Sequence, residues 1–244
     1  MNTVGTVIAS LDGTRLSLAG LLRWLRARGR LGPLVREALA AQLVKEEARR
    51  AGLSVPVEEV QAAADILRRR QGMDTAADTQ AWLAAQGLSL DDFEGRLEDA
   101  LLAARLKQHL TGPQVEEHFS AHRAGLEQLR LSVVFAGRDD LARELASQVR
   151  DEGRDLGEVA RAHGLSVVQQ RLLLEDLGAP LASALTGAAT GELVGPVETP
   201  QGLALVVVEE RRAAELDAAT RQRIQDTLFA RWMSARLGEA TLAP

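Results

Sequence analysis

The sequence contains no cysteine and only four histidines among its 244 residues. Without cysteine, the chain has no thiol nucleophile, no disulfide and no thiolate metal ligand. It also contains no Gly-rich phosphate loop, no nucleophile elbow and no H-E-x-x-H sequence, so nucleotide-dependent and hydrolytic enzymes lack their usual residues here. We therefore expect neither a cofactor nor a bound metal.

Basic residues are fewer than acidic ones, 29 against 34, which gives a net charge of −5. Because phosphate binding needs a basic face, this balance argues against a nucleic-acid partner. No apolar run approaches the length of about 20 residues that a membrane span needs, and the first residues do not follow the pattern of a secretory signal. We expect a cytoplasmic protein that does not insert into a membrane.

Helical periodicity dominates the first part of the chain, up to about residue 110. The opening VIASLDGTRLS predicts a short strand that turns at Asp12-Gly13, and Ser17 is a plausible N-cap for the helix that follows. A longer helix has Pro33 in its first turn and Gly52 at its end. The next helical pattern begins with acidic residues and ends with Arg68 to Arg70, which suits the helix dipole.

The periodicity changes at Leu129, where the apolar, β-branched run LRLSVVFA predicts a strand. From there to about residue 210 the pattern predicts the order β-α-α-β-α-β-β, and the final helical segment carries Leu228, Trp232 and Leu237 on one face. We predict an α+β protein. A helical domain spans residues 1–125 and is completed by a C-terminal helix at residues 213–240, while residues 126–212 form an inserted domain of strands and helices.

Four short motifs follow one another in the second half of the chain: Asp176-Leu177-Gly178, Thr190-Gly191-Glu192, Gly195-Pro196-Val197 and the T-x-x-G turn from Thr199 to Gly202. Their order and spacing resemble those of a parvulin-type peptidyl-prolyl isomerase domain. The flanking helical segments resemble the chaperone regions of SurA-like and PrsA-like foldases. The arrangement also resembles parvulin-related proteins associated with the maturation of ribosomal peptides.

The resemblance implies an apolar proline pocket beneath a polar cluster. It places the two family histidines at Ser132 and Ala204, and the family cysteine or aspartate at Val168. The pocket residues would be Leu177, Leu181 and Thr199, and the remaining candidates for substrate binding are Val134 and Gln201. The apolar elements are therefore retained while the polar cluster is not, and Ser132 is the one catalytic candidate, able to donate a single hydrogen bond.

Two readings of the function follow from this substitution. The chain is either a chaperone that binds an unfolded or precursor polypeptide, with weak or absent isomerase activity, or an active peptidyl-prolyl cis-trans isomerase. A third alternative is a scaffold subunit of a peptide-modifying complex. The client, proline-containing or not, and a dimeric state are left open by the sequence.

Two further groups of residues invite a functional reading. EEHFSAH places His118 and His122 one helical turn apart, a spacing that can bind a metal ion, but no third ligand is evident. We interpret this face as solvated. The three tryptophans, Trp24, Trp82 and Trp232, all fall in predicted helices. We expect them to pack in the core or between helices, unless one of them lines a chaperone surface.

Overall fold

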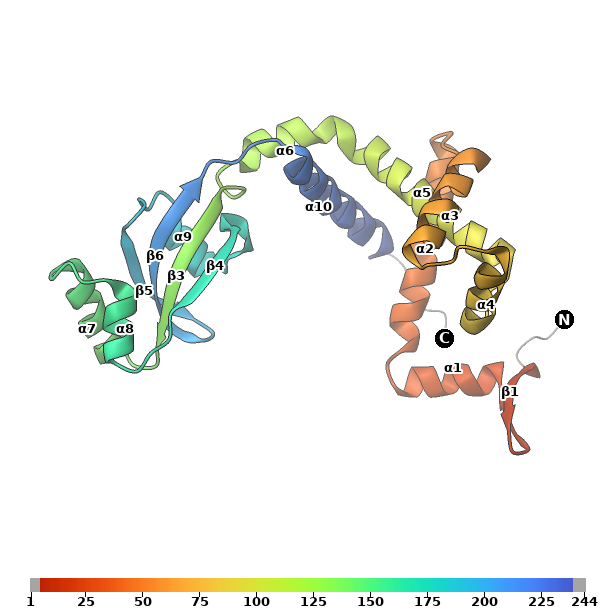
Figure 1. Ribbon diagram of the computed structural model, residues 1–244, viewed down its shortest axis with the longest axis horizontal. Helices are drawn as coiled ribbons and strands as arrows, with labels where there is room; N and C mark the ends of the chain where they lie inside the picture. The colour runs from red at the N-terminus through yellow and green to blue at the C-terminus, as the bar shows by residue number, and fades with distance from the viewer. Residues whose placement is uncertain (1–4, 239–244) are drawn as a thin grey trace. The chain divides into compact units, whose positions relative to one another are not determined.

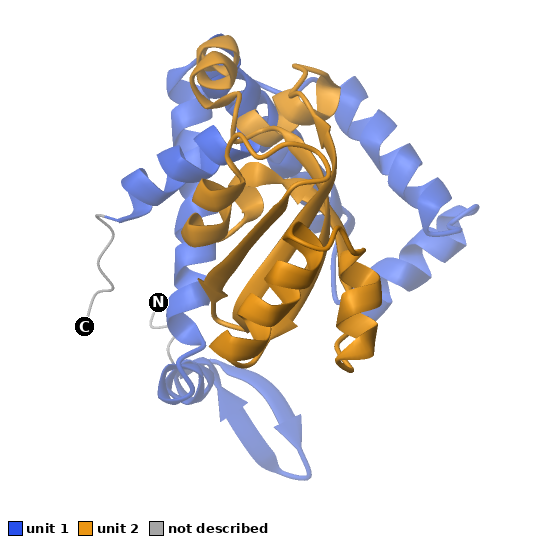
Figure 2. Ribbon diagram, turned by 90° about the vertical axis from the view of Figure 1, so that its left-hand side faces the viewer, with its two compact units in different colours: residues 1–113, 225–244 blue, residues 114–224 orange. Residues whose placement is uncertain are grey.

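The computed structural model describes residues 5–238, which form two compact units. Residues 1–113 and 225–244 make up one unit, and residues 114–224 make up the other (Figure 2). We call them the helical unit and the sheet unit. The division falls inside the last helix, α10 (Ala218–Leu237), whereas the sequence pattern placed the domain boundary before that helix. The predicted mixture of helix and sheet is confirmed. Among residues 5–238, no helix is long and apolar enough to cross a membrane.

The helical unit begins with a two-stranded hairpin and continues with five helices before α10 (Figure 1). The strands pair antiparallel around Asp12-Gly13, where both residues have positive φ, as a tight hairpin turn requires. These elements are β1 (Val7–Leu11), β2 (Thr14–Ser17), α1 (Leu18–Ala27), α2 (Leu31–Arg50), α3 (Val57–Arg70), α4 (Ala76–Gln86) and α5 (Leu90–Thr111).

Side-chain caps fix the starts of three of these helices. Ser17 accepts a hydrogen bond from the Gly20 amide at 3.1 Å, as its place before α1 predicted. Helices α4 and α5 each begin with a capping box, in which Thr75 or Ser89 accepts from the amide three residues later and an aspartate accepts in return. The hydrogen bonds from Thr75 and Ser89 lower the pKa of Asp78 and Asp92, respectively.

Burial in the helical unit is limited. A small buried cluster joins Ala64, Leu83 and Phe93, with Trp82 packed edge-on against Phe93 at 6.0 Å between ring centroids. In contrast to the expectation from sequence, Trp24 is 46% exposed.

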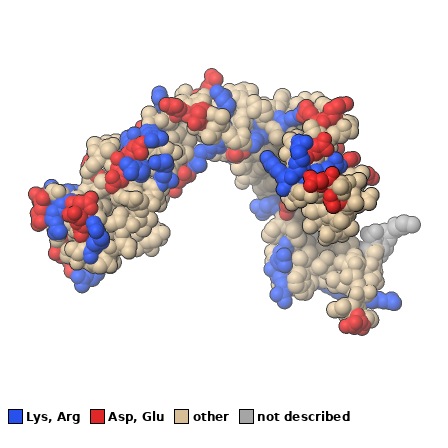
Figure 3. Space-filling model, viewed as in Figure 1, with Lys and Arg blue, Asp and Glu red and all other residues tan. Residues whose placement is uncertain are grey.

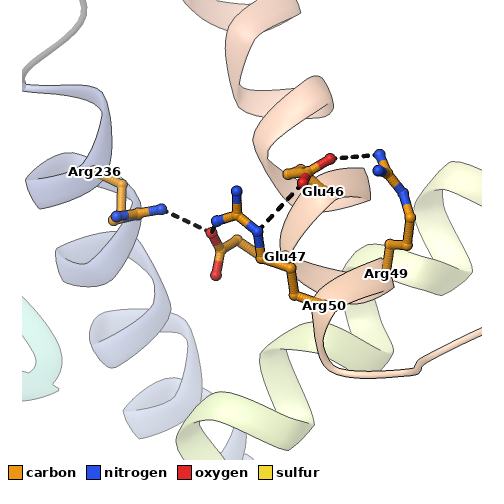
Figure 4. A network of polar contacts seen from close by, with 5 residues as sticks. All are labelled: Glu46, Glu47, Arg49, Arg50 and Arg236. Carbon is orange, nitrogen blue, oxygen red and sulfur yellow. Dashed lines mark hydrogen bonds and ion pairs between the residues drawn. The ribbon is translucent and has the colours of Figure 1, made fainter.

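Polar contacts complete the packing of α10 in this unit. The Lys107 Nζ of α5 lies 2.7 Å from the Asp226 Oδ1, and the Arg236 Nη2 lies 2.7 Å from the Glu47 Oε1 of α2. Glu47 also forms an ion pair with Arg50 at 2.8 Å, and Figure 4 shows Arg236 of α10 bound to Glu47 beside the other charged side chains of α2. The two helices therefore share one ion-pair network at the surface. Exposed pairs of this kind add little free energy each, so they orient the helices more than they stabilise them.

The sheet unit is built on four antiparallel strands in the order β4-β3-β6-β5 (Figure 1). Helices α7 and α8 pack on one face of this sheet, and α9 packs on the other. The elements in chain order are α6 (Val115–His122), β3 (Gln128–Ala136), α7 (Asp139–Arg150), α8 (Leu156–Ala162), β4 (Val168–Leu173), α9 (Ala179–Leu185), β5 (Leu193–Thr199) and β6 (Gly202–Arg212). Two short 3-10 turns, η2 (Gly112–Gln114) and η3 (Leu174–Asp176), connect α5 to α6 and β4 to α9.

Candidate functional site

A cavity of about 400 Å³ opens on the α9 face of the sheet unit. Three stretches of chain build it: the end of β3, the path from β4 into α9, and the turn between β5 and β6. Its lining is mostly apolar, and its polar groups come from β4, from the turn before α9, and from the end of β5 with the turn that follows. The lining residues are Phe135, Gln170, Leu172, Asp176, Leu177, Gly178, Pro180, Leu181, Glu198, Thr199, Pro200 and Gln201.

The connection from β4 to α9 supplies the apolar wall. Helix α9 begins at Ala179 after Gly178, and Pro180 sits in its first turn, where the backbone amide that a proline lacks would have no partner within the helix. Leu177 and Leu181 are partly buried and pack against the core cluster beneath the cavity. The two leucines that the resemblance assigned to a proline pocket therefore lie in one wall of the cavity.

The T-x-x-G turn forms the opposite rim. Thr199 donates a hydrogen bond to the Gly202 carbonyl at 2.7 Å and accepts one from the Gln201 amide at 3.3 Å. The Thr199 hydroxyl is thus committed to the turn, while Gln201 lies in the lining next to it. Thr199 shapes the rim, and Gln201 is the free hydrogen-bonding side chain of this turn.

Strand pairing defines the sheet surface beside the cavity. Ala204 of β6 is fully buried and pairs with Phe135 of β3. One step along the same face, Val133 pairs with Val168 on one side and Val206 on the other. Val168 and Ala204 therefore lie on the cavity face of the sheet. The resemblance assigns polar side chains to these two positions, but this chain has apolar ones there.

Ser132 and Val134 do not lie on this face, which corrects their assignment to the site. Successive strand residues point to opposite sides of a sheet, and Val133 belongs to the cluster on the α9 face. Val134 belongs to the cluster under α7 and α8, and Ser132, 5% exposed, points the same way. The β3 residue that faces the cavity side is Val133, so the only catalytic candidate from the sequence is removed from the site.

Acidic groups lie at the cavity rim. Arg223, in the first turns of α10, forms ion pairs with Glu175 at 2.9 Å and with the cavity residue Asp176. The hydrogen bond to Glu175, followed by that to Asp176, raises the pKa of the Arg223 guanidinium. Glu198 adds a second carboxylate to the lining. The cavity therefore has an apolar floor with acidic groups around it.

Histidines contribute nothing to the cavity lining given above. His118 and His122 stack on each other in α6, with ring centroids 4.0 Å apart. His122 Nδ1 lies 2.9 Å from the His118 carbonyl oxygen. Within residues 5–238, no three His, Cys, Asp or Glu side chains are grouped so that they could hold a metal ion.

Sequence reasoning missed part of the lining, notably Phe135, Gln170 and Leu172. The signal was present in β4, because Val168, Gln170 and Leu172 alternate on one side of the strand. The sequence alone does not reveal which side faces the cavity.

Comparisons with known proteins show which proteins this chain resembles. No protein-family model matches the chain. The chaperone SurA of Pseudomonas putida is 24% identical over 192 residues, which cover 67% of this chain and 44% of SurA. The chain thus matches less than half the length of this curated relative.

Solved structures of peptidylprolyl isomerases named PrsA match most of the chain. The protein from Bacillus cereus has a TM-score of 0.52 at 15% identity, over 99% of this chain and 95% of PrsA. That from Bacillus anthracis has a TM-score of 0.54 at 14% identity, over 86% of this chain and all of PrsA. The chain has a PrsA-like fold. The predicted resemblance to PrsA-like and SurA-like proteins is confirmed at this level.

Proposed function

We propose that this PrsA-like chain is a foldase-type chaperone that binds an unfolded or precursor polypeptide and has weak or absent prolyl isomerase activity. The cavity of the sheet unit would hold an apolar side chain or a proline of the client. In this proposal the sheet unit is a parvulin-like insertion in a SurA-like helical domain to which both ends of the chain contribute.

One observation carries the proposal: Val133, Val168 and Ala204 line the cavity face of the sheet with apolar side chains. Rotation about an imide bond must pass a barrier of about 18–20 kcal/mol. An enzyme lowers this barrier with groups that bind the twisted bond better than the planar one, chiefly placed hydrogen-bond donors and dipoles. The sheet surface offers none at these three positions, whereas Leu177 and Leu181 remain available for apolar contact.

Binding does not need the missing groups. Burying a leucine-sized or proline-sized side chain contributes about 1.5–3 kcal/mol, and the cavity walls at Leu177, Leu181 and Phe135 offer that contact. Gln170 and Gln201 lie in the lining and can hydrogen-bond the client backbone. Weak affinity combined with broad acceptance of clients is what this surface supports.

The test measures binding and turnover on the full chain. A fluorescently labelled apolar peptide that contains proline should bind, and Leu181→Glu should weaken its binding about tenfold or more, because the variant places a charge in the apolar wall. The matched control is Val57→Glu, an exposed apolar-to-acid change in the first turn of α3, where an acid suits the helix dipole. This control should bind like the unsubstituted chain.

Turnover decides between the two readings of the function. In a protease-coupled assay on a proline peptide, we expect acceleration far below that of a histidine-containing parvulin. Turnover close to that level, lost in Leu181→Glu, would replace the proposal with an active isomerase. Equal peptide binding by Leu181→Glu and the unsubstituted chain would remove the cavity from the function altogether.

A further inference from the structure

The first described part of the chain exposes apolar side chains over a continuous stretch. Helix α1 contributes no fully buried residue, and the hairpin before it contributes none. An exposed apolar side chain that stands alone is ordinary, whereas several of them on one small element leave that element with surface that a partner can cover. We call residues 7–36 the arginine arm; its large exposed apolar residues are Val7, Ile8, Leu11, Leu16, Leu22, Trp24 and Leu34.

The arginine arm is also the basic part of an acidic protein. It holds six arginines and a single acidic residue, Asp12, in a chain whose net charge is −5. Over the described residues, no ion pair involves any of these six, and Arg28 instead lies over the Trp24 ring at 5.0 Å. Arginines elsewhere in the helical unit, such as Arg50, Arg105 and Arg236, do pair with acids. Figure 3 shows this contrast around the hairpin and α1, where blue atoms lie among uncharged ones.

The hairpin offers a third property, an open backbone edge. Within residues 5–238, strands β1 and β2 pair only with each other, so each has one side without a strand partner there. A two-stranded hairpin is marginal alone, and an extended chain can add to such an edge through main-chain hydrogen bonds. The arm therefore combines uncovered apolar groups, unpaired arginines and free strand edges.

These three properties together select the occupant. A second copy docked through the same surface would bring arginines against arginines, which is unfavourable. An anionic lipid surface would suit the charge, but it would leave the backbone groups of the covered strand edge without partners. An extended polypeptide with acidic and apolar residues can satisfy all three.

We propose that the arginine arm binds extended acidic segments of a client polypeptide that also carry apolar residues, by adding them as a strand to the β1–β2 hairpin. Arg15, Arg23 and Arg26 pair with client carboxylates, and Trp24 and Leu16 contact the apolar residues. The inference rests on the proposed function in one respect, that the client is a polypeptide. It uses none of the cavity residues.

Peptide affinity for the full chain tests the assignment. The probe is a labelled synthetic peptide in which Glu alternates with Leu and Val, and its counterpart has Gln in place of each Glu. Arg15→Gln, Arg23→Gln and Arg26→Gln combined should weaken binding of the acidic peptide about tenfold. The matched control combines Arg70→Gln, Arg96→Gln and Arg231→Gln, three exposed arginines elsewhere in the helical unit, and should bind as the unsubstituted chain does. Equal binding of the Glu and Gln peptides would overturn the proposal.

A charge swap separates recognition from loss of structure. The variant with Arg15→Glu, Arg23→Glu and Arg26→Glu should reject the Glu peptide and bind a matched Lys peptide, which a merely unfolded arm cannot do. If it binds neither peptide while its circular dichroism is unchanged, the proposal fails. Binding to phosphatidylglycerol vesicles that displaces the acidic peptide, or a dimer that the three Arg→Gln changes dissociate, would assign the arm to another occupant and also overturn it.

The cavity variant Leu181→Glu distinguishes failure of the arm proposal from failure of the proposed function. Leu181→Glu should lose the proline peptide and still bind the acidic peptide with unchanged affinity. If Leu181→Glu loses both peptides while the arginine variants lose neither, the cavity is the only peptide site and the arm proposal falls alone.

Discussion

In the sheet unit, apolar side chains are buried on both faces of β3 and β6, whereas the helical unit leaves many of its large ones exposed. Among the described residues, every large apolar side chain that is exposed lies in the helical unit, with the exception of Val168 beside the cavity. A sheet with a helix layer on each side buries its own apolar surface. Long helices held by caps and surface ion pairs do not, so the helical unit retains surface suited to a partner.

The largest effect is expected when a core side chain of the sheet unit is removed, which tests the difference in burial between the two units. Leu145 of α7 is fully buried against β3 and β6, so Leu145→Ala should cost about 2–5 kcal/mol of unfolding free energy. All three tryptophans, Trp24, Trp82 and Trp232, belong to the helical unit. In urea, the variant should therefore lower the midpoint of the sheet transition seen by circular dichroism and leave the tryptophan fluorescence transition in place.

The matched change in the helical unit is Leu22→Ala, at an exposed position of α1. It should change the free energy of unfolding by less than about 0.5 kcal/mol, since little contact is lost. If both signals move together in Leu145→Ala, the two units unfold as one cooperative body, and their different burial does not make them independent.

A smaller effect is expected from the G-P-V motif. Gly195 has φ of +111°, and an added Cβ would lie 2.4 Å from the Ala204 carbonyl oxygen in the neighbouring strand. Gly195→Ala should cost the sheet unit about 3 kcal/mol, from backbone strain combined with this backbone clash. Gly187→Ala is the control, because Gly187 also has positive φ but has open space around it; it should cost about 1 kcal/mol. Equal costs would mean that the close approach between β5 and β6 contributes nothing.

The same motif shows what could be predicted from the sequence. The G-P-V and T-x-x-G motifs predict two strands joined by a turn, and β5 and β6 form that pair. Ser17 predicts the start of α1 because a cap is a local property of a few adjacent residues. Turns and caps depend on a few adjacent residues and little on the tertiary context, so they could be predicted from the sequence.

The candidate site was only partly predictable, because a sheet face depends on register. A shift of one residue moves a side chain to the other face, and the pairing of β3 with β6 is irregular at Arg130 and Leu131. That irregularity lies in β6, while β3 alternates without interruption from Leu129 to Val133. The resemblance placed the family position at Ser132, and the strand places Val133 on the cavity face. The exposure of Trp24 was missed for a related reason: periodicity identifies an apolar face but does not show whether another element covers it.

The smallest expected effect is a loss of stability of the helical unit at acidic pH. Hydrogen bonds from Thr75 and Ser89 hold the pKa of Asp78 and Asp92 below the ordinary value of 3.8. A carboxylate with a lowered folded-state pKa contributes stability that is complete above its unfolded pKa and is lost as the pH falls through the folded one. The helical unit should therefore weaken slightly below about pH 4, as followed by tryptophan fluorescence at a fixed urea concentration.

Removal of the caps shows whether these two aspartates are responsible. Thr75→Ala with Ser89→Ala should cost about 1 kcal/mol for each cap at neutral pH. It should also flatten the acid dependence, because the carboxylates would then have nearly the same pKa in the folded and unfolded chain. An unchanged acid transition in the double variant would place the acid sensitivity elsewhere in the helical unit.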